Sequence, residues 1–154
     1  DREYEAKGIE IESTYFIDAW DFRGNLTWTD AEIVKDALTP EVEGNTPRRQ
    51  ADLIYSLMAR YSYEKGAAGL SFIGTTDAYA QDNNDLKLDG YTQVNGFVSY
   101  DLSENLSLAL NVNNLFDTVG ITEAEEGSVP ANDIIRARTI NGRTTSLTLK
   151  YAFN

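Results

Sequence analysis

Hydrophobic and polar residues alternate along most of this chain with a period of two. The alternation is strictest in residues 106–112 and 147–153, where every second side chain is large and apolar. Because successive side chains of a β-strand point to opposite faces, this pattern indicates strands with one apolar and one polar face. Seven strands are predicted, at residues 9–16, 20–33, 51–63, 67–79, 91–102, 106–113 and 146–153. In residues 51–63 the polar face also carries Ile54 and Met58, and residues 30–38 (DAEIVKDAL) also allow a short helical turn in a loop.

The links between the predicted strands alternate in length. Short links fall at residues 17–19, 64–66 and 103–104, and long links at residues 34–49, 80–90 and 116–138. A soluble up-and-down barrel has no reason to gather its long loops at one end, whereas outer-membrane barrels have short periplasmic turns and long external loops. The links therefore favour an all-β, antiparallel transmembrane β-barrel in the bacterial outer membrane, with a periplasmic C-terminus.

Aromatic residues are spaced as a membrane slab requires. Trp20 and Trp28 share a face eight residues apart, and so do Tyr55 and Tyr63. Eight residues at roughly 3.3 Å rise, tilted by about 40°, cover roughly 20 Å along the membrane normal, close to the roughly 25 Å apolar band between aromatic girdles. Coincidental pairing in an aromatic-rich β protein is the alternative explanation.

The pattern of the two strands nearest the C-terminus predicts which side chains face lipid and which face inward. A shift of one residue would reverse every side chain, so strict alternation specifies which set meets lipid. The set expected to face lipid is Leu106, Leu108, Leu110, Val112, Leu147, Leu149, Tyr151 and Phe153, and the set expected to face inward is Ser107, Asn111, Thr148 and Lys150.

Composition narrows the possible functions. The chain has 154 residues, no Cys, no His and a net charge of −12. Without Cys and His it has no disulfide, no thiolate metal site and no Ser-His-Asp or Cys-His catalytic centre. The acidic balance argues against nucleic-acid binding, which needs a basic surface. The first ten residues lack a signal-peptide pattern, so we expect a mature chain or one that begins inside a longer one.

At the C-terminal end the sequence resembles the barrel of TonB-dependent receptors. In that family an Asn-Leu-Phe-Asp signature precedes the last external loop, a Gly-Arg pair opens the last strand, and an aromatic residue ends it. The matching residues are Asn114, Leu115, Phe116, Asp117, Gly142, Arg143 and Phe153. The family usually ends on the aromatic residue, whereas here Asn154 follows it. The segments AKGIEIES and LTWTDAEI also resemble the family's strands, so the resemblance covers nearly the whole chain.

The resemblance implies a 22-stranded barrel with a plug domain inside it. Residues 1–154 would form a C-terminal segment of that barrel, and the plug and the earlier strands would lie outside this chain. The implied function is binding and import of a scarce nutrient, such as a ferric siderophore or a carbohydrate, and not enzymatic catalysis. The implied partners are outer-membrane lipid, the rest of the barrel, the plug, the small-molecule nutrient and, through the plug, the TonB complex. No cofactor is implied.

Several polar residues are candidates for ligand contact. Charged side chains on the predicted polar face would be tolerated in a wet lumen but costly on a lipid face. Generic lumen polarity is the alternative explanation for any one of them. This set comprises Asp21, Arg23, Asp52, Arg60, Asp77, Asp101 and Lys150. Asp52, Asp77 and Tyr79 lie near the outer ends of their strands, so these three are the predicted ligand-binding residues.

Two acidic stretches contain residue types that occur in Ca²⁺ sites or in catalytic carboxylate pairs. Residues 82–89 (DNNDLKLD) carry oxygen ligands suited to Ca²⁺ but lack the Gly and Glu of an EF-hand loop. Residues 122–128 (TEAEEGS) contain the carboxylate pair Glu125 and Glu126, but no pocket is predicted around it. Both stretches are predicted to be solvated loops, and neither a metal site nor a catalytic site is predicted.

Two other architectures remain open at this point. One is a complete eight-stranded outer-membrane barrel with a structural or adhesive role, and the other is a soluble lipocalin-like binder. Single-chain bacterial barrels close with an even number of strands, and seven are predicted here. We therefore expect that the first and last strands do not pair with each other, because the missing strands belong to the rest of a larger barrel.

Overall fold

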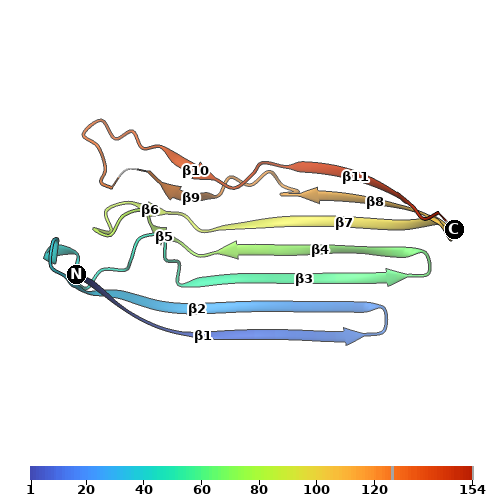
Figure 1. The fold of residues 1–154 in the computed structure, drawn as a ribbon, viewed down its shortest axis with the longest axis horizontal. Coiled ribbons are helices and arrows are strands. Elements are labelled where there is room, and N and C mark those ends of the chain that lie inside the picture. Colours follow the sequence, from blue (N-terminus) through green and yellow to red (C-terminus); the bar gives the residue numbers. More distant parts are fainter. Residues whose placement is uncertain (126, 154) are drawn as a thin grey trace.

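One antiparallel sheet contains all the long strands of the protein. The computed structural model describes residues 1–125 and 127–153, and Figure 1 shows the sheet face-on. Its seven strands follow the order β1-β2-β3-β4-β7-β8-β11, so each long strand lies beside the one that precedes it in sequence. The strands are β1 (Arg2–Ile17), β2 (Trp20–Asp36), β3 (Leu53–Tyr63), β4 (Gly66–Thr75), β7 (Tyr91–Ser103), β8 (Leu106–Asn113) and β11 (Thr144–Tyr151). The seven predicted strands are confirmed.

The links are sorted by length between the two ends of the sheet. The short turns lie at residues 18–19, 64–65 and 104–105, at the end where the chain finishes (Figure 1). The long loops, residues 37–52, 76–90 and 114–143, gather at the opposite end beside the N-terminus. We call these the turn end and the loop end. The predicted alternation of short and long links is confirmed.

Small elements occupy the long loops. They are the 3-10 helix η1 (Pro40–Val42), the pair β5 (Ala78–Tyr79) and β6 (Lys87–Leu88), and the pair β9 (Ile121–Ala124) and β10 (Ala137–Thr139).

Two details of the predicted strands are wrong. Residues 30–38 do not form a helical turn, because β2 continues to Asp36 by pairing with the start of β1. The strand predicted at residues 67–79 ends at Thr75, because the neighbouring strands β3 and β7 supply no partners beyond that point.

The two edges of the sheet remain apart. β1 and β11 stand at opposite ends of the strand order, and neither pairs with the other in the described part of the chain. The prediction that these strands do not close on each other is confirmed. A complete small barrel would need a hydrogen-bonded ladder between its first and last strands, and the described residues form no such ladder. The sheet is therefore open at both edges in the described part of the chain.

Pairing register divides the side chains into two faces. Directly opposed residues of neighbouring strands point to the same side of a sheet. Leu110 lies opposite both Leu147 and Val98, whereas Ser107 lies opposite Lys150 and Asp101. Carried across all seven strands, the same rule places apolar side chains on one face, which we call the apolar face. The polar face carries most of the Ser, Thr, Asn and charged residues of the same strands, although Ser13 and Thr92 have the register of the apolar face and Phe97 has that of the polar face. Within β8 and β11 the members of the two predicted sets fall on separate faces, as expected, whereas Phe153 lies beyond the end of β11.

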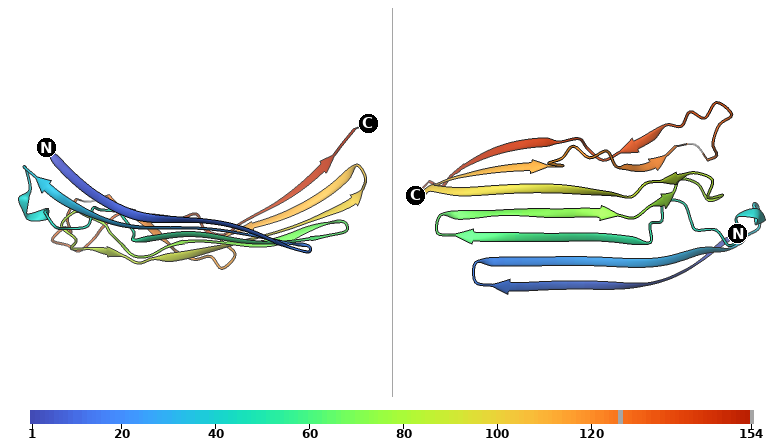
Figure 2. Two further views of the ribbon diagram at one scale, coloured as in Figure 1. Left: turned by 90° about the horizontal axis from the view of Figure 1, so that it is seen from below. Right: turned by 180° about the vertical axis from the view of Figure 1, so that it is seen from behind.

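The sheet is a single curved layer, and no second sheet or layer of helices covers it in the described part of the chain (Figure 2). Large apolar side chains of the apolar face are therefore open, with Ile9 60% exposed and Leu149 64% exposed. The few buried apolar residues gather mainly at the loop end, where Ala80, Leu88 and Ala124 form a small cluster. Within residues 1–125 and 127–153, no helix has the length and apolar character needed to cross a bilayer.

Aromatic side chains mark both ends of the apolar face. At the turn end Trp20 stacks on Phe22 with ring centroids 5.5 Å apart and contacts Tyr61 at 5.0 Å. At the loop end Tyr55 crosses over Gly74, where any Cβ would meet the Tyr55 ring, and its hydroxyl bonds to Thr92. Each predicted aromatic pair, Trp20 with Trp28 and Tyr55 with Tyr63, therefore has one member at either end of the apolar face.

Candidate functional site

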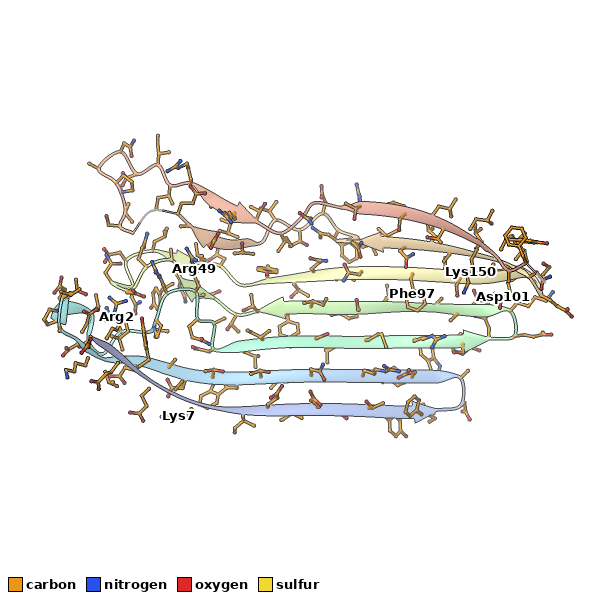
Figure 3. The ribbon with its side chains drawn as sticks, in the orientation of Figure 1. Arg2, Lys7, Arg49, Phe97, Asp101 and Lys150 are labelled. Atoms are coloured by element: carbon orange, nitrogen blue, oxygen red, sulfur yellow. The ribbon has the colours of Figure 1, made fainter. Side chains whose placement is uncertain are left out.

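The loop end is the part of the molecule where residues distant in sequence converge. Arg2, at the start of β1, pairs with Asp36 at the end of β2, and its Nη1 lies 2.5 Å from Asp82 Oδ2. Its Nη2 also donates to Thr39 Oγ1 at 3.3 Å. One guanidinium thus joins the first strand to two different loops, and Figure 3 labels Arg2 at this end of the sheet.

Asp36 is the buried anchor of this network. Only 3% of the residue is exposed, and it lies eight positions beyond Trp28. Its carboxylate accepts the Thr39 hydroxyl at 2.7 Å and the amides of Leu38 and Thr39 at 2.9 and 3.1 Å. The Thr39 hydroxyl lowers the pKa of Asp36 most, burial opposes it, and the Leu38 amide and Arg2 add to the lowering. The pKa lies well below its usual range, so Asp36 is ionised at any physiological pH.

Asp82 ties the second long loop to the first. Its Oδ1 accepts the Arg48 amide at 2.9 Å, and its carbonyl accepts Asn45 Nδ2 at 2.9 Å. Burial raises the pKa of Asp82, but the Arg48 amide and Arg2 outweigh that effect, so the net pKa is lowered. Asn84 reinforces the joint, because its side chain exchanges two hydrogen bonds with the backbone of Thr46, at 3.1 and 2.8 Å.

Arg49 ties the first long loop to the third. Its Nη1 lies 2.7 Å from Glu123 Oε2, and its Nη2 donates to the Ala124 carbonyl at 3.3 Å. Arg138 approaches the same Glu123 at 3.0 Å from β10. The apolar cluster of Ala80, Leu88 and Ala124, with Leu86 and Ile135 packed against it, joins the second and third loops. All three long loops therefore form one connected layer at the loop end, where Figure 3 places Arg49.

The three predicted ligand-binding residues lie at the loop end but do not form a cluster. Asp77 pairs with Lys87 Nζ at 2.7 Å and accepts the Gly90 amide at 2.8 Å. The Lys87 contact lowers the pKa of Asp77 most, and the Gly90 amide adds to it. The Tyr79 carbonyl accepts the Arg49 amide at 2.7 Å, and the Asp52 carbonyl accepts the Thr29 amide at 2.8 Å. Among the described residues no hydrogen bond or ion pair joins any two of the three, so their role in binding stays a prediction.

A cavity of about 230 Å³ lies beside these residues. Its walls include Ala51, Thr76 and Ala78, which are the chain neighbours of Asp52 and Asp77. Its floor includes Ile54 and Ile73 from the polar face. In the sequence pattern Ile54 falls on the polar face, where no role was predicted for it. That mismatch with the surrounding polar pattern was the available signal for the cavity.

The Asn-Leu-Phe-Asp signature forms the junction between β8 and the third long loop. Asn114 is 1% exposed and has a φ of 51°, a left-handed conformation that Asn tolerates better than most residues. Its Nδ2 donates to the carbonyls of Thr118 and Asn141 at 2.9 and 3.0 Å, and its Oδ1 accepts the Thr118 amide at 2.9 Å. The Leu115 amide donates to the Val94 carbonyl at 2.7 Å. Asn114 thus fastens both ends of the loop.

The Gly-Arg pair lies against the last residue of the same signature. Asp117 Oδ1 accepts the Arg143 amide at 2.8 Å, and a Cβ on Gly142 would come 3.2 Å from that oxygen. Phe116 is 71% exposed and takes no part in the junction. Phe153 is also exposed and packs edge-to-face on Tyr151 at 4.8 Å. Asn154, the departure from the family pattern, and Glu126 of the acidic pair lie outside the described residues.

Charged residues of the polar face are spread along it. Arg23 Nη2 pairs with Asp21 Oδ2 at 2.9 Å, and Arg60 lies opposite Asp21 in the neighbouring strand. Asp101 and Lys150, labelled in Figure 3, lie near the turn end, one strand to either side of Ser107. Among the residues that the structure describes, no group of three or more Asp and Glu side chains is arranged to hold a metal ion.

Comparison with known proteins is consistent across sequence and structure. The family described as TonB dependent receptor-like, beta-barrel matches residues 2–115. The ferrichrome outer membrane transporter/phage receptor of Escherichia coli (strain K12) is 34% identical over 125 residues, which cover 75% of this chain and 16% of that protein. The metal-pseudopaline receptor CntO of Pseudomonas aeruginosa (strain UCBPP-PA14) is 30% identical over 103 residues, covering 61% of this chain and 14% of that protein.

Solved structures show the same fold. The siderophore receptor PiuA from Acinetobacter baumannii superposes with a TM-score of 0.84 at 20% identity, over 97% of this chain and 22% of that chain. The ferric yersiniabactin uptake receptor FyuA from Yersinia pestis superposes with a TM-score of 0.83 at 19% identity, over 99% of this chain and 24% of that chain. This chain thus spans less than a quarter of each of these four proteins.

Proposed function

Because the chain belongs to the TonB-dependent receptor β-barrel family, we propose that it is the C-terminal wall segment of a receptor that imports a metal chelate. The observation that carries the proposal is the register-defined separation of an apolar and a polar face across all seven strands. In an outer-membrane barrel the first face meets lipid and the second meets the aqueous lumen. The outer membrane is the location of this family.

The apolar face suits a bilayer in both chemistry and extent. Its large side chains are open in the isolated sheet, and burying apolar surface is worth about 25 cal/mol per Å². Aromatic residues at both ends of this face, Trp20 and Tyr61 at the turn end and Trp28 and Tyr55 at the loop end, match the girdles at the two membrane interfaces. The free edges of β1 and β11 require partners, because unpaired backbone groups cost several kcal/mol each in lipid. The rest of the barrel is the proposed partner at both edges.

The loop end is the proposed external surface, and the polar face is the proposed surface toward the plug domain and the passing cargo. Asp52, Asp77 and Tyr79 remain proposed ligand contacts on this rim. The plug would couple the receptor to the TonB complex, so this chain's share is the wall, the lumen lining and three external loops. The cargo is proposed to be a metal chelate, because the relatives are named for ferrichrome, metal-pseudopaline and yersiniabactin.

Uptake by whole cells tests this function. The full-length receptor is expressed in an Escherichia coli strain that lacks its own ferric-chelate receptors, and ⁵⁵Fe uptake is measured from ferrichrome, ferric citrate and ferric yersiniabactin. We expect uptake of at least one chelate that depends on both the receptor and TonB. A receptor that reaches the outer membrane but imports none of the three would contradict the proposal.

A further inference from the structure

Two isoleucines interrupt the polar face near its loop end. Ile54 lies opposite Thr27 and Thr75, and Ile73 lies opposite Ser56 and Gln93, so each isoleucine sits in a row of polar residues. Ile54 is 52% exposed and Ile73 is 44% exposed. Apolar side chains that line water in this way gain nothing from their position unless another apolar group covers them.

The two isoleucines form the floor of the 230 Å³ cavity described above. Leu88 from the second long loop and Ile121 from the third add apolar side chains to its lining, and Arg49 and Tyr91 are polar members of the same lining. Residues of three strands and of all three long loops thus line one partly open space on the polar side of the sheet. We propose that this cavity binds a single uncharged aromatic ring carried by the imported chelate, a role that rests on the proposed function.

The volume of the cavity fits one aromatic ring but not a whole chelate. Pockets that hold drug-sized ligands measure roughly 300–1,000 Å³, whereas an engineered apolar cavity of about 150 Å³ accepts benzene. A cavity of about 230 Å³ therefore accommodates one ring with a small substituent. The metal and its chelating groups remain in the lumen outside.

The charges around the cavity favour a neutral ring. Arg49 is already paired with Glu123 at 2.7 Å, and Asp89 adds a carboxylate to the wall. An anionic substituent would meet this carboxylate without a free cation to balance it. The Arg49 guanidinium donates in its own plane to Glu123 and Ala124, which leaves its flat face suited to stacking on a ring.

Two residues that line the cavity, Tyr91 and Arg49, are held in position by neighbours within the chain. The Tyr91 ring lies so close to Gly120 that a Cβ there would come 2.5 Å from it. The Arg49 amide is fixed by the Tyr79 carbonyl at 2.7 Å. A preorganised site loses less entropy on binding than a mobile one, so contacts with a ring translate efficiently into affinity.

Cavity filling tests the proposal on the full-length receptor. The probes are ferrichrome and a ferrichrome analogue in which one hydroxamate acyl methyl group is replaced by phenyl, both neutral iron complexes. In the Ile73→Trp variant we expect the dissociation constant of the phenyl analogue to rise by about ten-fold or more, the scale for loss of one apolar pocket contact. Ferrichrome should change less than two-fold. The control variant, Leu70→Trp, lies on the same strand with its side chain on the opposite face.

A fragment probe separates this inference from the transport function. Binding of 4-fluorophenol to the same variants is followed by ¹⁹F NMR. Loss of binding in Ile73→Trp but not in Leu70→Trp supports the cavity even if no chelate is imported, a result that would overturn only the transport function. Import of a chelate without any effect of Ile73→Trp on either the phenyl analogue or 4-fluorophenol would overturn the cavity alone. Equal weakening of both chelates by this variant would also overturn it.

Discussion

Replacing Asn114 with alanine removes the side chain that fastens the third long loop to the sheet. Three hydrogen bonds to backbone groups of Thr118 and Asn141 are lost. Each is worth about 1 kcal/mol net, and alanine also tolerates the 51° φ angle less well, by roughly 1–2 kcal/mol. Water reaching the exposed Asn141 offsets part of the loss, so we expect a local cost of about 3 kcal/mol.

Hydrogen exchange of the full-length receptor measures this cost locally. A cost of about 3 kcal/mol raises the population of the open junction by roughly 100-fold, and amide exchange at residues 114–118 should accelerate by a similar factor. The Asn114→Asp variant keeps the acceptor of the Thr118 amide, so its exchange rate should fall between those of the unaltered receptor and Asn114→Ala. The matched control is Asn113→Ala, whose side chain is exposed and donates only to Thr144 Oγ1 at 3.4 Å. Equal acceleration in Asn113→Ala and Asn114→Ala would refute the reasoning.

Three further predictions concern the loops and the faces. Asp82→Asn should speed tryptic cleavage within residues 37–52 several-fold at pH 7, because the ion pair with Arg2 is lost. In the unaltered receptor the folded-state pKa of Asp82 is lowered. The contribution of Asp82 to loop stability is therefore complete above the unfolded pKa of about 3.9 and disappears only as the pH falls below that value. Loss of loop protection between pH 7 and 5 would contradict this assignment. Leu110→Arg should reduce folded receptor in outer-membrane fractions, since a lipid-facing Arg costs roughly 2–4 kcal/mol at mid-membrane, whereas Asn111→Arg should be tolerated. Protease added to intact cells should cut first in residues 116–138, and cleavage only after the outer membrane is opened would reverse the orientation.

Strand content and facing were determined by the sequence alone. Period-two alternation is a local property, because each side chain's direction follows from its own strand position. It therefore identified all seven long strands and separated Leu110 from Asn111 without knowledge of any partner. The ends of strands were less well determined. β2 runs to Asp36 because the residues around Arg2 pair with it, and that pairing is not visible in the pattern of residues 30–36 themselves.

The candidate site was decided by tertiary structure. Arg2 and Asp82 lie 80 positions apart, and Arg49 lies 75 positions before Ala124, so nothing in the local sequence predicts their contacts. The signature at Asn114 was identified by resemblance, but its physical role emerged only when both ends of the third loop came together around one buried amide. The cavity at Ile54 and Ile73 likewise exists only because residues of all three long loops meet beside these strands. Alternation reports which face a residue occupies, whereas binding depends on which loops meet above that face, and loop contacts arise from long-range packing.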